Sequence, residues 1–182
     1  MFNVTGGIKA WHAEIAIGSQ DLGMDLFSGK EEPLDVLKVA YSLEQGLREF
    51  YLVMGKEAKN EKVKDLFAKL SEIEVKHQMS IYLAYNDISD EELSKDAFEK
   101  MVEIKALEGG LSTREYLDLF NPDLNSEIDV ISLAMSIEAQ ALDLYQRVSS
   151  KVKNPQSRGI INKIGDEEKV HLESLGKLLD NL

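Results

Sequence analysis

Apolar residues recur at helical spacing in four long stretches of this chain. Two of these stretches span about 33–59 and 61–86, and two more span about 127–152 and 155–180. In each stretch the apolar side chains return every three or four residues, which places them on one face of a helix. Asn60 separates the first two stretches, and Asn154 followed by Pro155 separates the last two. The pattern predicts an all-α protein in which two helical hairpins form a four-helix bundle.

The segment that connects the two hairpins is about forty residues long. Ser89 precedes three acidic residues and predicts a helix that runs to about Leu107, where a Gly-Gly break follows. A second, short helix is predicted from Thr113 to about Asn121. A connection of this length suits one long crossover along the bundle, so that the third long helix runs parallel to the second.

Residues 1–30 do not continue the bundle pattern, because glycines punctuate them repeatedly. They predict a short irregular extension. The expected domain organisation is therefore an amino-terminal extension over 1–30 and a helical bundle over 31–182.

Glutamates and histidines interrupt the apolar faces at matching positions in the two hairpins. Each hairpin has a lone Glu in its first helix and a Glu-x-x-His pair in its second, and corresponding residues lie 94 positions apart. The repeated residues are Glu44, Glu74 and His77 in the first hairpin, and Glu138, Glu168 and His171 in the second. Glu167 lies four residues before His171 and is an alternative to Glu168, although the repeat favours Glu168.

Helix geometry brings the repeated side chains to one level of the bundle. In each hairpin 30 residues separate the lone Glu from the paired Glu, with the turn near the midpoint. At a rise of about 1.5 Å per residue, the two carboxylates return to nearly the same height. Residues three apart share a helix face, so each His points the same way as its paired Glu. All six side chains are expected to meet in one layer.

Two lone glutamates and two Glu-x-x-His pairs are the ligand set with which four facing helices hold two iron or manganese ions. Taken singly, each Glu would be a solvated surface residue and each His a satisfied core residue. Together they lie within apolar stripes, where unpaired carboxylates would cost several kcal/mol. The sequence therefore predicts a binuclear metal site. Without metal, crowding and burial are expected to raise the pKa of some of these carboxylates.

Two tyrosines occupy matching positions beside this layer. Tyr51 and Tyr145 each follow the lone Glu of their hairpin by seven residues, which is two turns along the same face. As candidate catalytic residues, they would donate a hydrogen bond to a ligand carboxylate or transiently carry an oxidising equivalent. The alternative is core packing with a hydrated phenol oxygen.

Composition narrows the classes of function. The chain has 182 residues, of which 43% are hydrophobic, enough for one substantial core. The net charge of −12 opposes binding to nucleic acids and to anionic membranes. The absence of cysteine excludes disulfides, iron–sulfur clusters and a rubredoxin-type iron centre. No apolar run reaches the length of a membrane span and no secretory signal is evident, so a cytoplasmic location is expected.

Four segments around the repeated residues, namely 40–51, 73–77, 134–145 and 166–171, resemble the rubrerythrin branch of the ferritin-like superfamily. The resemblance implies a ferritin-like four-helix bundle with a non-haem centre of two iron ions, for which manganese or zinc could substitute. It also implies a homodimer that reduces hydrogen peroxide or reacts with oxygen. The alternative function is iron binding for sequestration, with ferroxidase activity, and a third is a structural bundle that holds an adventitious ion.

The chain departs from the pattern of that family in two ways. Typical rubrerythrins carry a cysteine-ligated iron domain that delivers electrons, whereas this chain has no cysteine. An external donor such as a rubredoxin or a flavoprotein is therefore expected. Typical members also place a further ligand Glu three residues after the lone Glu of the third long helix, where this chain has Ala141.

The segment 2–11, with its Gly-Gly turn and terminal Trp11, resembles the end of a rhodanese domain. No rhodanese cysteine loop accompanies it, so sulfur transfer by this chain is not expected. The resemblance implies the carboxy-terminal portion of a rhodanese–rubrerythrin fusion, or a relic of one. An ordinary hairpin tail is the alternative.

Overall fold

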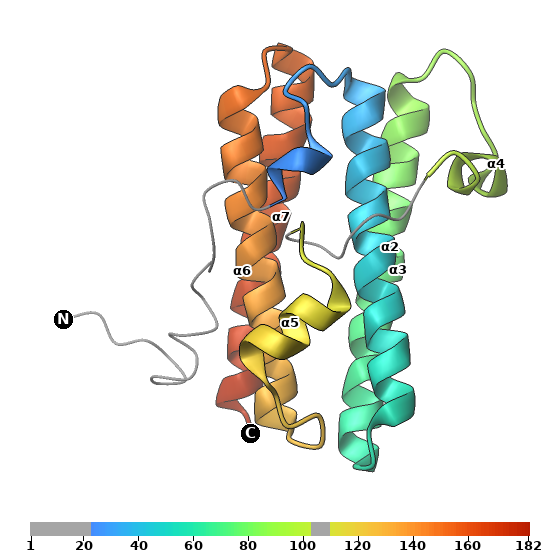
Figure 1. Ribbon diagram of the computed structural model, residues 1–182. Coiled ribbons are helices and arrows are strands. Elements are labelled where there is room, and N and C mark those ends of the chain that lie inside the picture. Colours follow the sequence, from blue (N-terminus) through green and yellow to red (C-terminus); the bar gives the residue numbers. More distant parts are fainter. Residues whose placement is uncertain (1–22, 103–109) are drawn as a thin grey trace.

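The computed structural model describes residues 23–102 and 110–182. Within these residues it contains six α-helices, one short 3-10 helix and no strands (Figure 1). Four long helices form the bundle: α2 (Pro33–Glu57), α3 (Glu61–Ile88), α6 (Glu127–Lys151) and α7 (Pro155–Asp180). Each lies within two residues of its predicted range, and the predicted all-α bundle is confirmed. In the described part of the chain, no helix is both long and apolar enough to cross a bilayer.

Side chains that accept hydrogen bonds from free backbone N–H groups fix the starts of three long helices. Asn60 accepts from the N–H of Lys62 at the start of α3. Asn154 accepts from two N–H groups at the start of α7, and Ser126 does the same for one N–H at the start of α6. The Asn residues predicted to mark the hairpin turns therefore begin the second helix of each hairpin.

The long helices pack most closely within the hairpins α2–α3 and α6–α7. Figure 1 shows that α6 runs in the same direction as α3, as the long crossover predicted. Within the crossover, α5 (Thr113–Phe120) crosses the bundle obliquely and begins with a capping box formed by Ser112 and Glu115. Its Tyr116 is fully buried in an apolar cluster that also contains residues of the four long helices.

The prediction of a helix from Ser89 to about Leu107 is wrong over its first part. Ser89 ends α3, and the next helix, α4, covers only Lys95–Glu99. Side chains of α3 hold the residues between them in a non-helical path, because Tyr82 and Asn86 both donate hydrogen bonds to the carbonyl of Leu93. The end of the predicted helix falls partly on residues outside the described ranges.

Near the amino terminus, the 3-10 helix η1 (Met24–Leu26) follows Gly23, whose φ is 71°. The backbone of Gly23 lies directly against Gly110, whose φ of 88° also favours glycine. This contact joins the start of the described chain to the segment before α5. The predicted rhodanese likeness of residues 2–11 lies outside the described residues, and nothing in the structure tests the domain boundary at residue 30.

Among the residues that the structure describes, the apolar core forms two clusters, one toward each end of the bundle. The first includes Leu47 and Leu70, and the second includes Tyr41 and Ile81. Along α2 and α3, the sequence positions between these clusters hold buried glutamates. A polar layer therefore crosses the middle of the apolar core, at the level where the repeated residues were predicted to meet.

Candidate metal centre

The repeated residues form two compact groups, one in each hairpin. Within each group, every residue offers one ligand atom, and these atoms all lie within 4.8 Å of one another. All four carboxylate residues are at most 3% exposed. The groups are Glu44, Glu74 and His77 in the first hairpin, and Glu138, Glu168 and His171 in the second.

The two groups have nearly the same internal geometry. The Nδ1 atom of His77 lies 2.9 Å from Oε2 of Glu74 and 3.3 Å from Oε2 of Glu44. In the second group, Nδ1 of His171 lies 3.0 Å from Oε2 of Glu168 and 3.5 Å from Oε2 of Glu138. The repeat in the sequence is therefore also a repeat in three dimensions.

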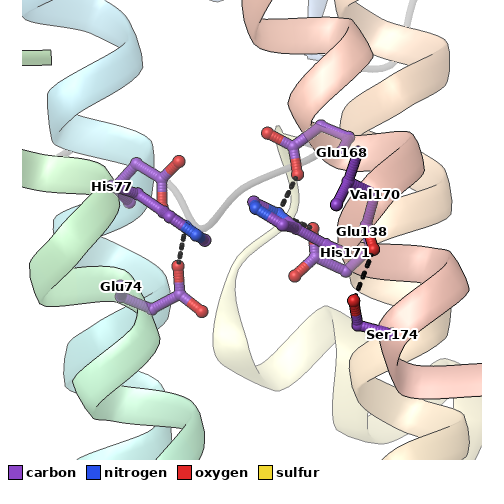
Figure 2. Close-up of polar contacts among 8 residues, drawn as sticks. Glu74, His77, Glu138, Glu168, Val170, His171 and Ser174 are labelled. Carbon is purple, nitrogen blue, oxygen red and sulfur yellow. Dashed lines mark hydrogen bonds and ion pairs between the residues drawn. The ribbon is translucent and has the colours of Figure 1, made fainter. Parts of the chain in front are cut away.

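The two groups face each other across the interior of the bundle. The rings of His77 and His171 are stacked, with centroids 3.9 Å apart and planes inclined by 8°. Figure 2 shows the two imidazoles extending toward each other from opposite hairpins, with Glu74 below the ring of His77 and Glu168 above the ring of His171 in this view. The prediction that all six side chains converge in one layer thus agrees with the geometry of the structure.

In the second group, electrostatic interactions favour the ionised form of Glu138 and the protonated form of His171. Burial opposes ionisation of Glu138, but its contacts with Glu168 and His171 and the charges of both histidines outweigh burial and hold its pKa below the ordinary value. Burial likewise opposes protonation of His171, yet Glu138, Glu74 and Glu167 together raise the pKa of that imidazole. Glu138 is thus not among the carboxylates whose pKa is raised, because its hydrogen bonds with Glu168 and His171 and the charges of the histidines stabilise its ionised form.

The donor set fits a binuclear site for a transition metal. Imidazole and carboxylate ligands suit iron, manganese and zinc, and four carboxylates would neutralise two divalent ions. Without such ions, four nearly inaccessible carboxylates depend on two histidines for compensating charge. A bundle with a dry core is expected to retain this arrangement only if cations occupy it.

The structure distinguishes between the neighbouring candidates on α7. Glu168 is fully buried and contacts the His171 ring, whereas Glu167 is half-buried and belongs to neither compact group. On α6, Ala141 stands at the position where the resembled family has a further ligand Glu. This residue is fully buried in an apolar cluster, so the position belongs to the core.

Tyr51 and Tyr145 are each 1% exposed, and they lie in different apolar clusters. The ring of Tyr51 packs against Phe50 and Phe67. The rings of both tyrosines are therefore buried in the core, which agrees with the core-packing part of the alternative given above. A hydrogen bond from either tyrosine to a ligand carboxylate stays a prediction.

Two buried glutamines beside the layer did not emerge from the sequence. Gln78 follows His77 directly and is 3% exposed, and Gln140 lies two residues after Glu138 and is 1% exposed. The residues 94 positions away from them are Leu172 and Gly46. Neither is a glutamine, so the sequence repeat does not mark these two positions. A buried amide on a helix that already carries ligands is recognisable only from the tertiary structure.

A bundle of ferritin-like type, with paired carboxylate–histidine groups in its interior, defines the class of this protein. The rubrerythrin family model matches residues 35–179, and the chain belongs to the rubrerythrin family. Searches of curated proteins and of solved structures returned no match.

Proposed function

We propose that this protein is a non-haem di-iron oxidoreductase that reduces hydrogen peroxide, or reacts with oxygen, with electrons from an external donor. The observation that supports this proposal is the pair of facing Glu-Glu-His groups with stacked imidazoles. Because the chain has no cysteine, the electrons would come from another protein, such as a rubredoxin or a flavoprotein. Membership of the rubrerythrin family supports a di-iron protein in general terms.

The residues that would hold the two ions are Glu44, Glu74 and His77 together with Glu138, Glu168 and His171. Bound iron would supply the redox chemistry by cycling between its ferrous and ferric states. The chain fixes the donors on four helices, between two apolar clusters of the core. The histidine side chains are 17% and 16% exposed, which leaves small molecules a way to the layer.

Proton supply is the second task of the chain in this proposal. Reduction of peroxide to two molecules of water consumes two protons along with two electrons. The contact of Glu138 with Glu168, together with the pKa of His171, which Glu138 raises above its ordinary value, supports a role for this layer in holding protons. The candidate catalytic residues Tyr51 and Tyr145 would assist as phenol donors to the ligand carboxylates.

An anaerobic experiment tests the proposal. The protein is loaded with Fe(II) and mixed with stoichiometric peroxide in the presence of a reductant, while near-ultraviolet absorption and peroxide consumption are followed. Fast consumption over repeated turnovers would support peroxide reduction. Absence of tight iron binding would reject the proposal.

Iron sequestration with ferroxidase activity is the second candidate. The observation that favours it is Ala141, because the fully buried methyl group takes the place of a carboxylate that typical rubrerythrins possess. In the same experiment, sequestration would appear as accumulating ferric product without repeated consumption of peroxide.

A further inference from the structure

An elongated pocket of about 330 Å³ opens beside the candidate metal layer. Three metal-layer residues, Glu74, Glu138 and His171, form its inner end. Lys62 and Glu127, which belong to the first turns of α3 and α6, line it further along the bundle. Since Lys62 precedes Glu74 by twelve residues, the pocket extends roughly 18 Å along α3. This volume falls within the range of pockets that hold small organic ligands.

The walls of this pocket are apolar. Leu66, Leu70, Ile131 and Leu175 are buried in the wall. At its edge, Ile73, Leu178 and Leu182 are 37%, 40% and 56% exposed, so large apolar side chains border the opening. A ligand that covered them would remove this apolar surface from water, which is favourable.

The helix α5 does not cover the pocket. Figure 1 shows α5 crossing α6 on the way from the crossover. The pocket lies among α3, α6 and α7, and α5 contributes no residue to its lining. Of the crossover residues that the structure describes, none closes this side of the bundle.

The inner end of the pocket carries only carboxylates among its acidic and lysine residues, namely Glu74 and Glu138. Farther out, Lys69 and the pair of Lys62 with Glu127 line the pocket, so lysine side chains occur only in this outer part. Lys62 makes only a long ion pair, with Nζ 3.8 Å from Glu127. Lys69 makes no ion pair with any residue of the described ranges. An anionic group is repelled from the inner end and attracted to the lysines.

We propose that this pocket binds an aliphatic chain with one anionic end group, the chemistry of a fatty acid. The chain lies between the leucines of α3 and α7, and its carboxylate pairs with Lys69 and Lys62. This inference goes beyond the proposed redox function, because it concerns a ligand that binds the metal-free protein as well. It also places an organic molecule within contact of Glu74, Glu138 and His171.

Isothermal titration of the metal-free protein with dodecanoate tests this proposal. The expected result is one site with a dissociation constant on the order of 10 μM. Dodecanol, which has the same tail without the charge, is expected to bind more weakly. Ser174→Trp places a large ring in the pocket and should weaken dodecanoate binding at least about tenfold, whereas Glu173→Trp on the neighbouring exposed position should not.

Charge reversal supplies an independent test. The double variant Lys62→Glu with Lys69→Glu should weaken dodecanoate binding at least about tenfold and leave dodecanol binding unchanged. The matched control, Lys153→Glu with Lys163→Glu, changes the net charge equally at exposed positions outside the pocket. Circular dichroism and metal titration of each variant verify its fold.

Failure of this proposal is distinguishable from failure of the proposed function. Tight iron binding with no dodecanoate binding would overturn only the fatty-acid site. Equal binding by the Ser174→Trp and Glu173→Trp variants would also overturn it. If dodecanoate does not bind and Ser174→Trp dissociates a dimer in sedimentation experiments, the pocket is an interface between copies of the chain, and the proposal is wrong.

Discussion

Each histidine in the metal layer contacts the two carboxylates of its own hairpin. His77 and His171 approach their paired Glu residues to 2.9 and 3.0 Å, and both rings are exposed to a similar small extent. Each imidazole can therefore coordinate an ion when it is neutral, or offset the charge of the neighbouring carboxylates when it is protonated and no ion is bound. Changes at these residues should therefore affect metal binding before they affect the fold.

Replacement of one histidine should impair one half of the site. His171→Ala is expected to lower bound Mn(II) from two ions to one per chain and to weaken the remaining ion, by at least the roughly 10–100-fold that changes around metal ligands cost. His77→Ala should do the same, because the two groups have matching geometry. Equilibrium dialysis measures the stoichiometry. Ser174→Ala, which removes only a hydrogen bond to Val170, is the control (Figure 2).

The raised pKa of His171 predicts that metal binding releases protons. In the metal-free protein, the protonated imidazole is stabilised by Glu138. This stabilisation is fully present below the unfolded pKa of about 6.5 and is lost as the pH rises through the higher folded value. A metal ion must displace that proton, so its affinity should increase with pH across the same window. Calorimetry at pH 7 in buffers of different ionisation enthalpy measures the release. Identical apparent enthalpies in all buffers would contradict the prediction.

At the scale of elements, the spacing of apolar residues was sufficient to predict the four long helices but not the path of the crossover. The helices α2, α3, α6 and α7 begin at recognisable caps or prolines and carry continuous apolar faces, so local sequence determines them. The path of residues 89–94 depends on hydrogen bonds from Tyr82 and Asn86 to Leu93, which are contacts between elements. The acidic residues after Ser89 suggested a helix start because no local signal reveals such contacts.

The contact between Gly23 and Gly110 should be intolerant of any side chain. A Cβ at Gly110 would lie 2.5 Å from the Cα of Gly23, and the φ of 88° is unfavourable for other residues. Gly110→Ala is expected to lower the free energy of unfolding by about 1–3 kcal/mol in urea denaturation. Gly159→Ala is the matched control, since a Cβ there meets open space in α7 and should stabilise the helix by up to about 1 kcal/mol. Equal stability of Gly110→Ala and the unchanged protein would disprove the close contact.

At the scale of the whole molecule, the polar layer divides the core and the crossover leaves one side of the bundle accessible. The level of the layer was predictable, because each turn falls near the midpoint between the two glutamates of its hairpin and so returns the carboxylates to nearly the same height. The pocket beside it was not, since its lining combines side chains of three helices, α3, α6 and α7, whose mutual packing the sequence pattern does not give. Sequence thus predicted the candidate ligands and the fold, whereas access to the site is a property of tertiary packing.

Metal should stabilise the whole bundle, because the two hairpins contribute equal halves of one site. The hairpins pack less closely with each other than the helices within each hairpin do. Ions that bind only the folded state add about 2.7 kcal/mol of stability at a free concentration one hundred times the dissociation constant. For a chain of this size, that gain corresponds to a Tm increase of roughly 5–10 °C. Differential scanning calorimetry with Mn(II), or anaerobically with Fe(II), measures the shift. The variant with both His77→Ala and His171→Ala should lose most of it, and an equal shift in that variant would place the stabilising ions elsewhere.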